Sequence, residues 1–112
     1  MHMIEAIIKP SSIDGIKSKL AGLGILGMTA LECKGFGKQK GHTERYRGGR
    51  MDVGFVPKVT LKIAVREEDL DKAISAIESA ARTGNVGDGK VFVYPLAKVV
   101  RIRTGETDND AL

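Results

Sequence analysis

The chain has 112 residues, a length that predicts one domain with one hydrophobic core. A hydrophobic content of 42% and a charged content of 29% are ordinary for a globular domain and exclude a disordered chain. The formal charge of +4 favours anionic ligands without requiring nucleic acid. One cysteine excludes an internal disulfide framework, and no signal peptide or membrane-spanning apolar run is visible, so we expect a cytoplasmic protein without membrane insertion.

Hydrophobic periodicity divides the chain into six elements. Alternation of apolar and polar residues from Val59 to Arg66 predicts a half-buried strand, whereas apolar residues at three- and four-residue spacing predict helices. Ser11 and Asp14 fit a capping box at the start of the first helix, and Gly24 fits its C-terminal cap. In chain order we predict a strand at residues 3–9, a helix at 13–23, strands at 27–34 and 57–66, a helix at 67–81 that Gly84 ends, and a strand at 91–100 that Pro95 interrupts.

This order is that of the ferredoxin-like βαββαβ sandwich, an α+β fold. The connection between the second and third strands, residues 35–56, is longer than connections in compact domains usually are. It is polar and basic with few apolar anchors, so we expect it to be flexible when no ligand or partner is bound. The acidic tail at residues 106–110 is expected to be mobile as well.

Three glycine-rich or basic segments predict an anion site. Residues 34–48 read K-G-F-G-K-Q-K-G-H-T-E-R-Y-R-G, where glycine permits close backbone approach and the cations supply charge. A second glycine-rich loop, residues 84–90, ends in Lys90. Arg101 and Arg103 follow it. Together the three segments suggest one composite nucleotide site.

Two nucleotide-binding motifs match only in part. Residues 84–90 fit G-x-x-x-x-G-K, but Val91 stands where a P-loop has serine or threonine, and no helix follows. Gly35, Gly37 and Gly41 miss the spacing of the dinucleotide-binding fingerprint. Outside the motif, the loop at residues 84–90 can still hold phosphate through its backbone amides and Lys90; the alternative is a plain turn with an exposed lysine.

An RRM-like RNA-binding protein is the alternative from another class. Residues 34–37, K-G-F-G, match the start of the RRM signature, and an RRM shares the predicted fold. The match ends at Lys38, where base-stacking aromatic residues should follow, and aromatics make up only 4% of the chain. We therefore expect no direct contact with nucleic acid.

Catalytic residues are not predicted. His42 lies in the long connection without a paired nucleophile or metal-ligand spacing, and the carboxylates cluster at a helix start and in the tail. We therefore expect a protein that is not an enzyme.

Over essentially its whole length the chain resembles the PII nitrogen-regulatory signalling proteins. The resemblance lies in E-A-I-I-K-P, G-M-T, K-G-F-G-K-Q-K-G-H-T-E, Y-R-G, F-V-P-K-V, T-G-N-V-G-D-G-K-V-F-V and R-I-R-T-G-E, at residues 5–10, 27–29, 34–44, 46–48, 55–59, 83–93 and 101–106. It implies one PII-like domain over residues 1–112, with a phosphate-binding loop at 82–90 and a C-terminal segment at 99–112. It also implies a homotrimer that senses ATP or ADP and 2-oxoglutarate in clefts between subunits. Slow ATP hydrolysis, which some members show, remains a residual option.

The resemblance assigns roles to individual residues. The nucleotide would contact Gly35, Gly37, Lys38 and Gln39 at the base of the long loop, Ile7, Thr29 and Ala64 near its base or ribose, and Gly87, Asp88, Gly89, Lys90, Arg101 and Arg103 around its phosphates. Gln39 would coordinate Mg²⁺ together with the ATP phosphates and 2-oxoglutarate. Lys58 would pair with a carboxylate of 2-oxoglutarate.

The tip of the long loop is implied to dock partner proteins through Arg45, Tyr46 and Arg47. The implied partner is an ammonium transport channel, which would recruit the protein to the membrane, or a nitrogen-metabolism enzyme or regulator. Met51 and Gly49 stand where relatives carry a uridylylated tyrosine or a phosphorylated serine, so neither modification is expected here.

Lys62 is a departure within the nucleotide region. It stands where members of the family commonly have a glutamate near the adenine and ribose. A lysine ammonium, which only donates hydrogen bonds, thus replaces a carboxylate, which accepts them. We expect this change to alter nucleotide affinity or base selectivity.

Overall fold

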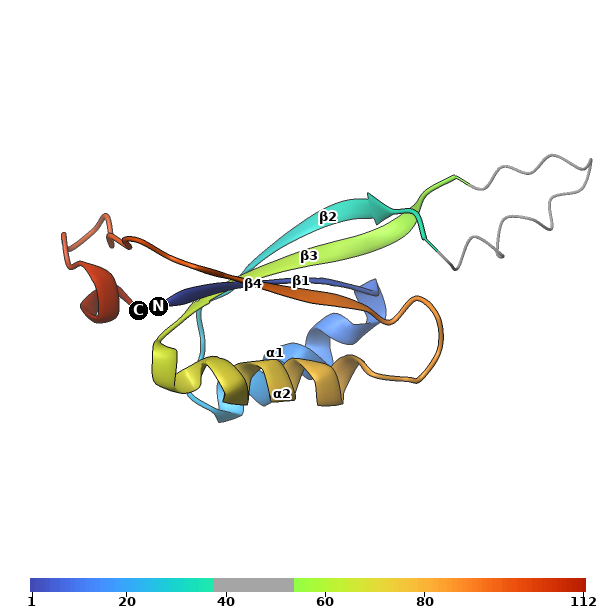
Figure 1. Ribbon diagram of the computed structural model, residues 1–112, viewed down its shortest axis with the longest axis horizontal. Helices are drawn as coiled ribbons and strands as arrows, with labels where there is room; N and C mark the ends of the chain where they lie inside the picture. Colours follow the sequence, from blue (N-terminus) through green and yellow to red (C-terminus); the bar gives the residue numbers. More distant parts are fainter. Residues whose placement is uncertain (38–53) are drawn as a thin grey trace, which may run out of the picture.

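Four antiparallel strands form one sheet, and two helices pack on one of its faces in the computed structural model of the chain (Figure 1). The structure describes residues 1–37 and 54–112. Its strands, in the order β2-β3-β1-β4, confirm the ferredoxin-like α+β prediction. The elements are β1 (His2–Ile8), α1 (Ile13–Gly22), β2 (Thr29–Gly35), β3 (Val56–Val65), α2 (Leu70–Ala81) and β4 (Gly89–Pro95).

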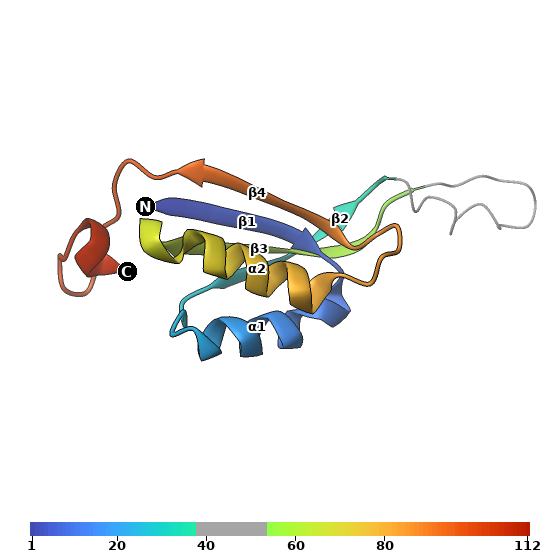
Figure 2. The same ribbon diagram turned by 60° about the horizontal axis from the view of Figure 1, so that its bottom comes forward.

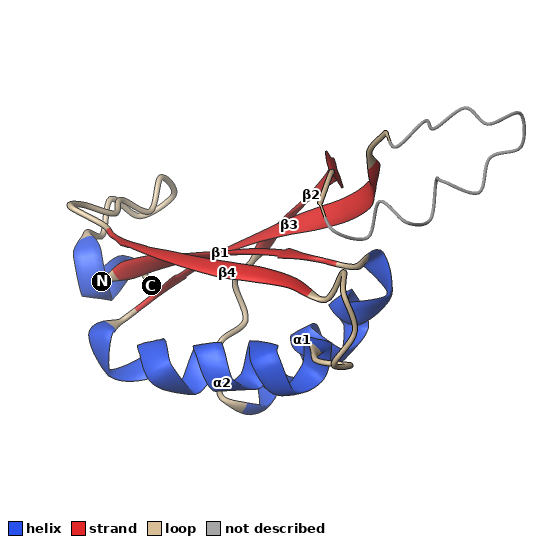
Figure 3. Cartoon of the chain, turned by 45° about the vertical axis from the view of Figure 1, so that its right-hand side comes forward, coloured by secondary structure: helices blue, strands red, loops and turns tan. Residues whose placement is uncertain are grey.

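Strand alternation gives the sheet one covered and one bare face. Figure 3 shows both helices on the same side of the sheet. In β1 and β3, every second side chain faces the helices and is buried, because successive residues of a strand point to opposite faces. The opposite face carries no helix in the described part of the chain. The buried core consists of Ile4, Ala6, Ile8, Ile16, Leu20, Val59, Leu61, Ile63, Val65, Ala73, Ile77 and Ala81.

The predicted glycine cap of the first helix is confirmed. Gly24 has a φ of +82°, a conformation that glycine adopts without strain. Its N–H donates to the Ala21 carbonyl at 2.9 Å, and the Ile25 N–H donates to the Leu20 carbonyl at 3.0 Å. These two bonds form a Schellman motif, which satisfies the last carbonyls of α1.

The predicted capping box at the start of the same helix is wrong. A short 3₁₀ turn at Pro10–Ser12 precedes α1, so Ser11 lies inside this turn instead of capping the helix. The N-cap residue is Ser12, and its side chain makes no capping hydrogen bond. Instead, the Ser12 N–H donates to the Lys9 carbonyl at 3.0 Å, because the proline fixes a tight turn directly after β1.

Two boundaries in the second half differ from the sequence prediction. A 3₁₀ turn, Glu67–Asp69, leads into α2, and the helix ends at Ala81 because Arg82 is already extended. Gly84, with a φ of +90°, therefore bends the following loop and does not cap α2. Pro95 ends β4, because a proline has no N–H for a strand ladder.

The C-terminal segment is folded back where we expected a resuming strand and a mobile tail. Val100 and Thr107 form an isolated antiparallel bridge, and residues Asp108–Ala111 form a 3₁₀ turn. The segment lies beside the N-terminus, at the end of the sheet opposite the 82–90 loop (Figures 1 and 2). No helix among the described residues is long and apolar enough to cross a bilayer.

Candidate functional site

Most described residues of the expected site fall into two groups at opposite ends of the sheet. One group lines a pocket of about 580 Å³ beside the 82–90 loop, here called the loop-end pocket. The other lines a pocket of about 810 Å³ beside the C-terminal segment, here called the tail-end pocket. The loop-end pocket contains Ile7, Gly35, Gly37, Lys58, Gly87, Gly89 and Lys90, and the tail-end pocket contains Thr29, Ala64 and Arg101. Asp88 and Arg103 line neither pocket.

The separation of the two groups follows from strand length. Thr29 and Gly35 are the first and last residues of β2. Six steps of about 3.3 Å place them roughly 20 Å apart. A single small ligand could contact both residues of one chain only by lying along the whole strand.

Lys58 connects the two walls of the loop-end pocket. It is only 8% exposed, and its Nζ donates to the Gly87 carbonyl at 2.8 Å. Its aliphatic stem lies against Gly35, where an added Cβ would be 3.0 Å from the Lys58 Cγ. A buried ammonium requires a hydrogen-bonding partner, and here the partner is a neutral carbonyl. A carboxylate would be a stronger partner for the same group.

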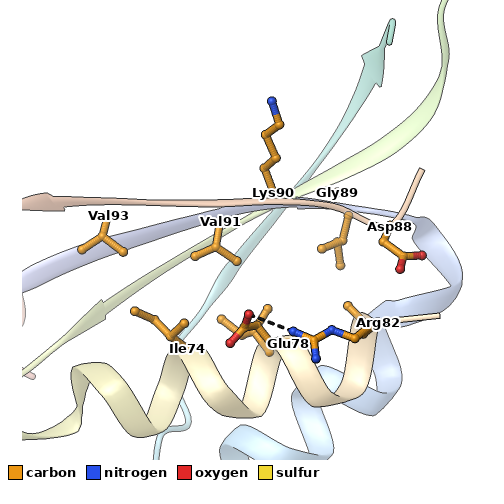
Figure 4. Close-up of a pocket in the computed structure, with 11 residues that line it drawn as sticks. Ile74, Glu78, Arg82, Asp88, Gly89, Lys90, Val91 and Val93 are labelled. Carbon is orange, nitrogen blue, oxygen red and sulfur yellow. Dashed lines mark hydrogen bonds and ion pairs between the residues drawn. The ribbon is translucent and has the colours of Figure 1, made fainter. Parts of the chain in front are cut away.

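Lys90 is the open cation of this pocket. It is the second residue of β4, and Figure 4 shows its side chain pointing away from α2, toward the bare face of the sheet. Among the described residues it forms no hydrogen bond or ion pair with another side chain. Together with the glycine backbone around it, Lys90 gives the pocket the chemistry of a phosphate or carboxylate site.

Gly89 brings the 82–90 loop directly onto β1. Its φ is +109°, and an added Cβ would lie 1.9 Å from the carbonyl oxygen of Ile7. Only glycine fits such an approach. This contact fixes where β4 begins and so where Lys90 stands.

Asp88 organises the same loop from within. Its carboxylate accepts hydrogen bonds from the Thr83 N–H at 2.7 Å, the Thr83 hydroxyl, and the Gly84 N–H at 2.9 Å, and it lies 3.3 Å from the Lys9 ammonium. The bonds from Thr83 are the largest of the causes that hold the pKa of Asp88 well below its ordinary value. The side chain therefore binds the amides of its own loop, so any contact of Asp88 with phosphates would come from its backbone.

The C-terminal segment fixes the arginines of the tail-end pocket. Arg101 pairs with Glu106 at 2.9 Å and donates to the Ala111 carbonyl at 3.3 Å. Arg66 donates to the Asn109 carbonyl at 2.9 Å. Arg103 is exposed and lines neither pocket. Because Glu106 neutralises much of its charge, Arg101 attracts an anion in the tail-end pocket of its own chain less strongly.

A third pocket, of about 390 Å³, lies between α2 and β4 and was not predicted from the sequence (Figure 4). Its lining combines apolar side chains of α2 and β4 with charged ones, among them Arg82 and Glu78, which form an ion pair of 3.1 Å. Of the expected site residues that the structure describes, Asp88, Gly89 and Lys90 border it. The apolar periodicity of α2 and β4 predicts that they pack together, but it does not predict a pocket between them.

Several expected residues lie outside the described part of the chain. These are Lys38 and Gln39 of the nucleotide and Mg²⁺ site, and Arg45, Tyr46 and Arg47 of the docking tip. Within residues 1–37 and 54–112, no group of three or more histidine, cysteine, aspartate or glutamate side chains could hold a metal ion. The expected flexibility of the long loop also concerns mainly residues outside this part.

The RRM hypothesis is not supported by the position of Phe36. This residue follows β2 and packs edge-on against Phe55, with ring centroids 6.0 Å apart. An RRM would need the corresponding aromatic ring on the sheet, where it stacks on bases.

Fold and pockets together define a small α+β ligand-binding domain whose glycine- and cation-rich loops suit small anions. Residues 1–106 match the family model described as nitrogen regulatory protein P-II. The chain therefore belongs to the PII nitrogen-regulatory protein family, a family of regulatory signalling proteins, as the sequence resemblance predicted.

Relatives cover the full length of the chain. A nitrogen regulatory protein P-II of Pasteurella multocida (strain Pm70) is 53% identical over 112 residues, which is 100% of both chains. The nitrogen regulatory protein P-II 1 of Escherichia coli (strain K12) is 51% identical with the same coverage. The crystal structure of Arabidopsis thaliana PII bound to citrate is similar with a TM-score of 0.83 and 36% identity, and the match covers 99% of this chain and 91% of that chain.

Proposed function

We propose that this chain is a cytoplasmic, non-enzymatic sensor that binds ATP or ADP in the clefts between subunits of a homotrimer. In the presence of ATP and Mg²⁺ it also binds 2-oxoglutarate. The long loop then reports the ligand state to partner proteins.

The two separated half-sites are the observation that carries this proposal. The loop-end pocket supplies glycine backbone and Lys90 for phosphates, whereas the tail-end pocket supplies Thr29 and Ala64 with Arg101 nearby. Among the described residues, neither pocket alone has all the groups that a nucleotide needs. Closed rings of identical subunits bring unlike surfaces together, so the loop-end pocket of one subunit can meet the tail-end pocket of the next.

Lys58 supports the binding of a dicarboxylate beside the nucleotide. Its buried ammonium now donates to the Gly87 carbonyl, and a 2-oxoglutarate carboxylate would replace that carbonyl with a charged acceptor. Gln39 would complete the site by offering its side-chain oxygen to Mg²⁺, which prefers oxygen ligands. Arabidopsis thaliana PII binds citrate, another small carboxylate, which supports an effector of this class.

The loop tip would transmit the signal through Arg45, Tyr46 and Arg47. ATP with 2-oxoglutarate would stabilise one loop conformation and ADP another, because a ligand shifts a conformational equilibrium only through its differential affinity for the two states. The partner is an ammonium transport channel, which recruits the protein to the membrane, or a nitrogen-metabolism enzyme or regulator.

Titration calorimetry on the wild-type chain tests this function. ATP and ADP should each bind, and 2-oxoglutarate should bind only when ATP and Mg²⁺ are both present. The matched controls are 2-oxoglutarate with ADP, and 2-oxoglutarate with ATP and a chelator. Binding of 2-oxoglutarate without nucleotide, or its absence under the full conditions, would contradict the proposed sensor.

A further inference from the structure

Lys62, on β3, is a cation of the tail-end pocket that the structure leaves without a partner. The other cations there, Arg66 and Arg101, are both held by groups of the C-terminal segment. Glu5 lies directly opposite Lys62 in the β1–β3 pair, yet its carboxylate accepts the Tyr94 hydroxyl at 3.3 Å. Among the described residues the Lys62 side chain forms no hydrogen bond or ion pair, so its ammonium is available to a ligand.

The surroundings of Lys62 suit a planar base better than a phosphate. Thr29 pairs with Lys62 across β2 and β3, and Ala64 is the next residue of β3 on the same bare face. Ile25 and Met28 add apolar side chains to the same pocket. Ligand sites of this kind combine apolar walls with a few polar groups that fix orientation. The glycine backbone that phosphates need is in the loop-end pocket instead.

The hydrogen-bonding chemistry of lysine then discriminates between the purines. An ammonium offers three donors and no acceptor. Guanine presents two neighbouring acceptors, O6 and N7, whereas adenine presents N7 beside its N6 amino donor. We propose that Lys62 is a base-specificity residue and that the nucleotide site accepts guanine nucleotides about as well as adenine nucleotides. This inference rests on the proposed function and deepens it by naming the ligand class.

The test compares ATP with GTP by titration calorimetry on the wild-type chain and on Lys62→Gln. The wild-type affinities for GTP and ATP should lie within about tenfold of each other. Glutamine carries a donor and an acceptor that match N7 and N6 of adenine, so Lys62→Gln should raise the preference for ATP by about tenfold or more. The matched control is Lys17→Gln, which removes one positive charge from the exposed surface of α1. It should leave the ratio of the ATP affinity to the GTP affinity unchanged.

A second variant tests the hydrogen-bond donors of Lys62. Lys62→Met keeps most of the length of the side chain but removes its charge and its donors. Loss of charge alone would weaken the two triphosphates equally, so loss of the donors should appear as a larger loss of GTP binding than of ATP binding. Thermal melting of each variant establishes that it is folded.

Three results would count against the inference or its basis. If the wild-type chain binds ATP more than a hundredfold tighter than GTP, the inference is wrong but the proposed function stands. The same holds if Lys62→Gln does not change the ratio of the ATP affinity to the GTP affinity. Binding of neither nucleotide to the wild-type chain would overturn the proposed function itself.

Discussion

At the scale of single residues, two charged groups hold the 82–90 loop in place beside the loop-end pocket. Lys58 is buried and donates to the Gly87 carbonyl, and Asp88 is occupied by Thr83, Gly84 and Lys9. Both therefore position the 82–90 loop, whereas Lys90 remains open to a ligand. Loops of this kind hold anions well when their backbone is fixed before the ligand arrives.

Replacing Asp88 by asparagine should destabilise the chain in a pH-dependent way. Because the pKa of Asp88 is lower in the folded chain than its ordinary value of 3.8, its ionised form stabilises the fold above that pH. The difference in melting temperature between the wild type and Asp88→Asn should therefore be constant near neutral pH. It should shrink as the pH falls below about 4.

Thermal melts of both proteins across this pH range check the prediction. Asp14→Asn, at an exposed position of α1, is the control for loss of one surface carboxylate. A wild-type advantage that grows in acid would have the opposite sign and would refute the role assigned to Asp88.

At the scale of elements, the junction between the 82–90 loop and β4 depends on one glycine. Gly89 combines a positive φ with a close approach to the backbone of β1. Gly22, near the end of α1, has no such restriction, because an added Cβ would meet nothing within 4 Å. The same substitution should therefore have opposite effects at the two positions.

Gly89→Ala should lower the free energy of unfolding by more than about 2 kcal/mol, since it adds backbone strain and a steric clash. Gly22→Ala should raise it by about 0.5–1 kcal/mol, because glycine within a helix is unfavourable relative to alanine. Chemical denaturation of the two variants measures both changes. Equal effects of the two substitutions would show that the β1–β4 contact does not constrain the chain.

The sequence predicted the number, order and type of these elements, because each one carries its own apolar periodicity. Gly24 was identified correctly because a helix cap is a local feature. The capping box at Ser11 failed because Pro10 starts a 3₁₀ turn, a choice that a pattern of residue types does not reveal. The fold of the C-terminal segment depends on contacts such as Arg66 with Asn109, which join distant parts of the chain.

At the scale of the whole molecule, the expected site residues are divided between two ends of one sheet. The sequence resemblance supplied their identities, but the division became visible only through strand register and pocket geometry. Which side chains remain unpaired, such as Lys62 and Lys90, likewise depends on neighbours that are distant in sequence. From this division we infer that one nucleotide site requires two subunits.

ATP binding in mixed assemblies tests this claim most directly. Lys90→Ala damages the loop-end pocket and Arg101→Ala the tail-end pocket, so each variant alone should lose most of its ATP affinity. The two variants are mixed in equal amounts, unfolded and refolded together. An intact cleft then forms wherever the loop-end pocket of an Arg101→Ala subunit meets the tail-end pocket of a Lys90→Ala subunit. Random assembly predicts ATP binding at roughly a quarter of the clefts, with wild-type chain refolded in the same way as the reference. A mixture that binds no more ATP than the separate variants, while the refolded wild type binds normally, would contradict the shared site.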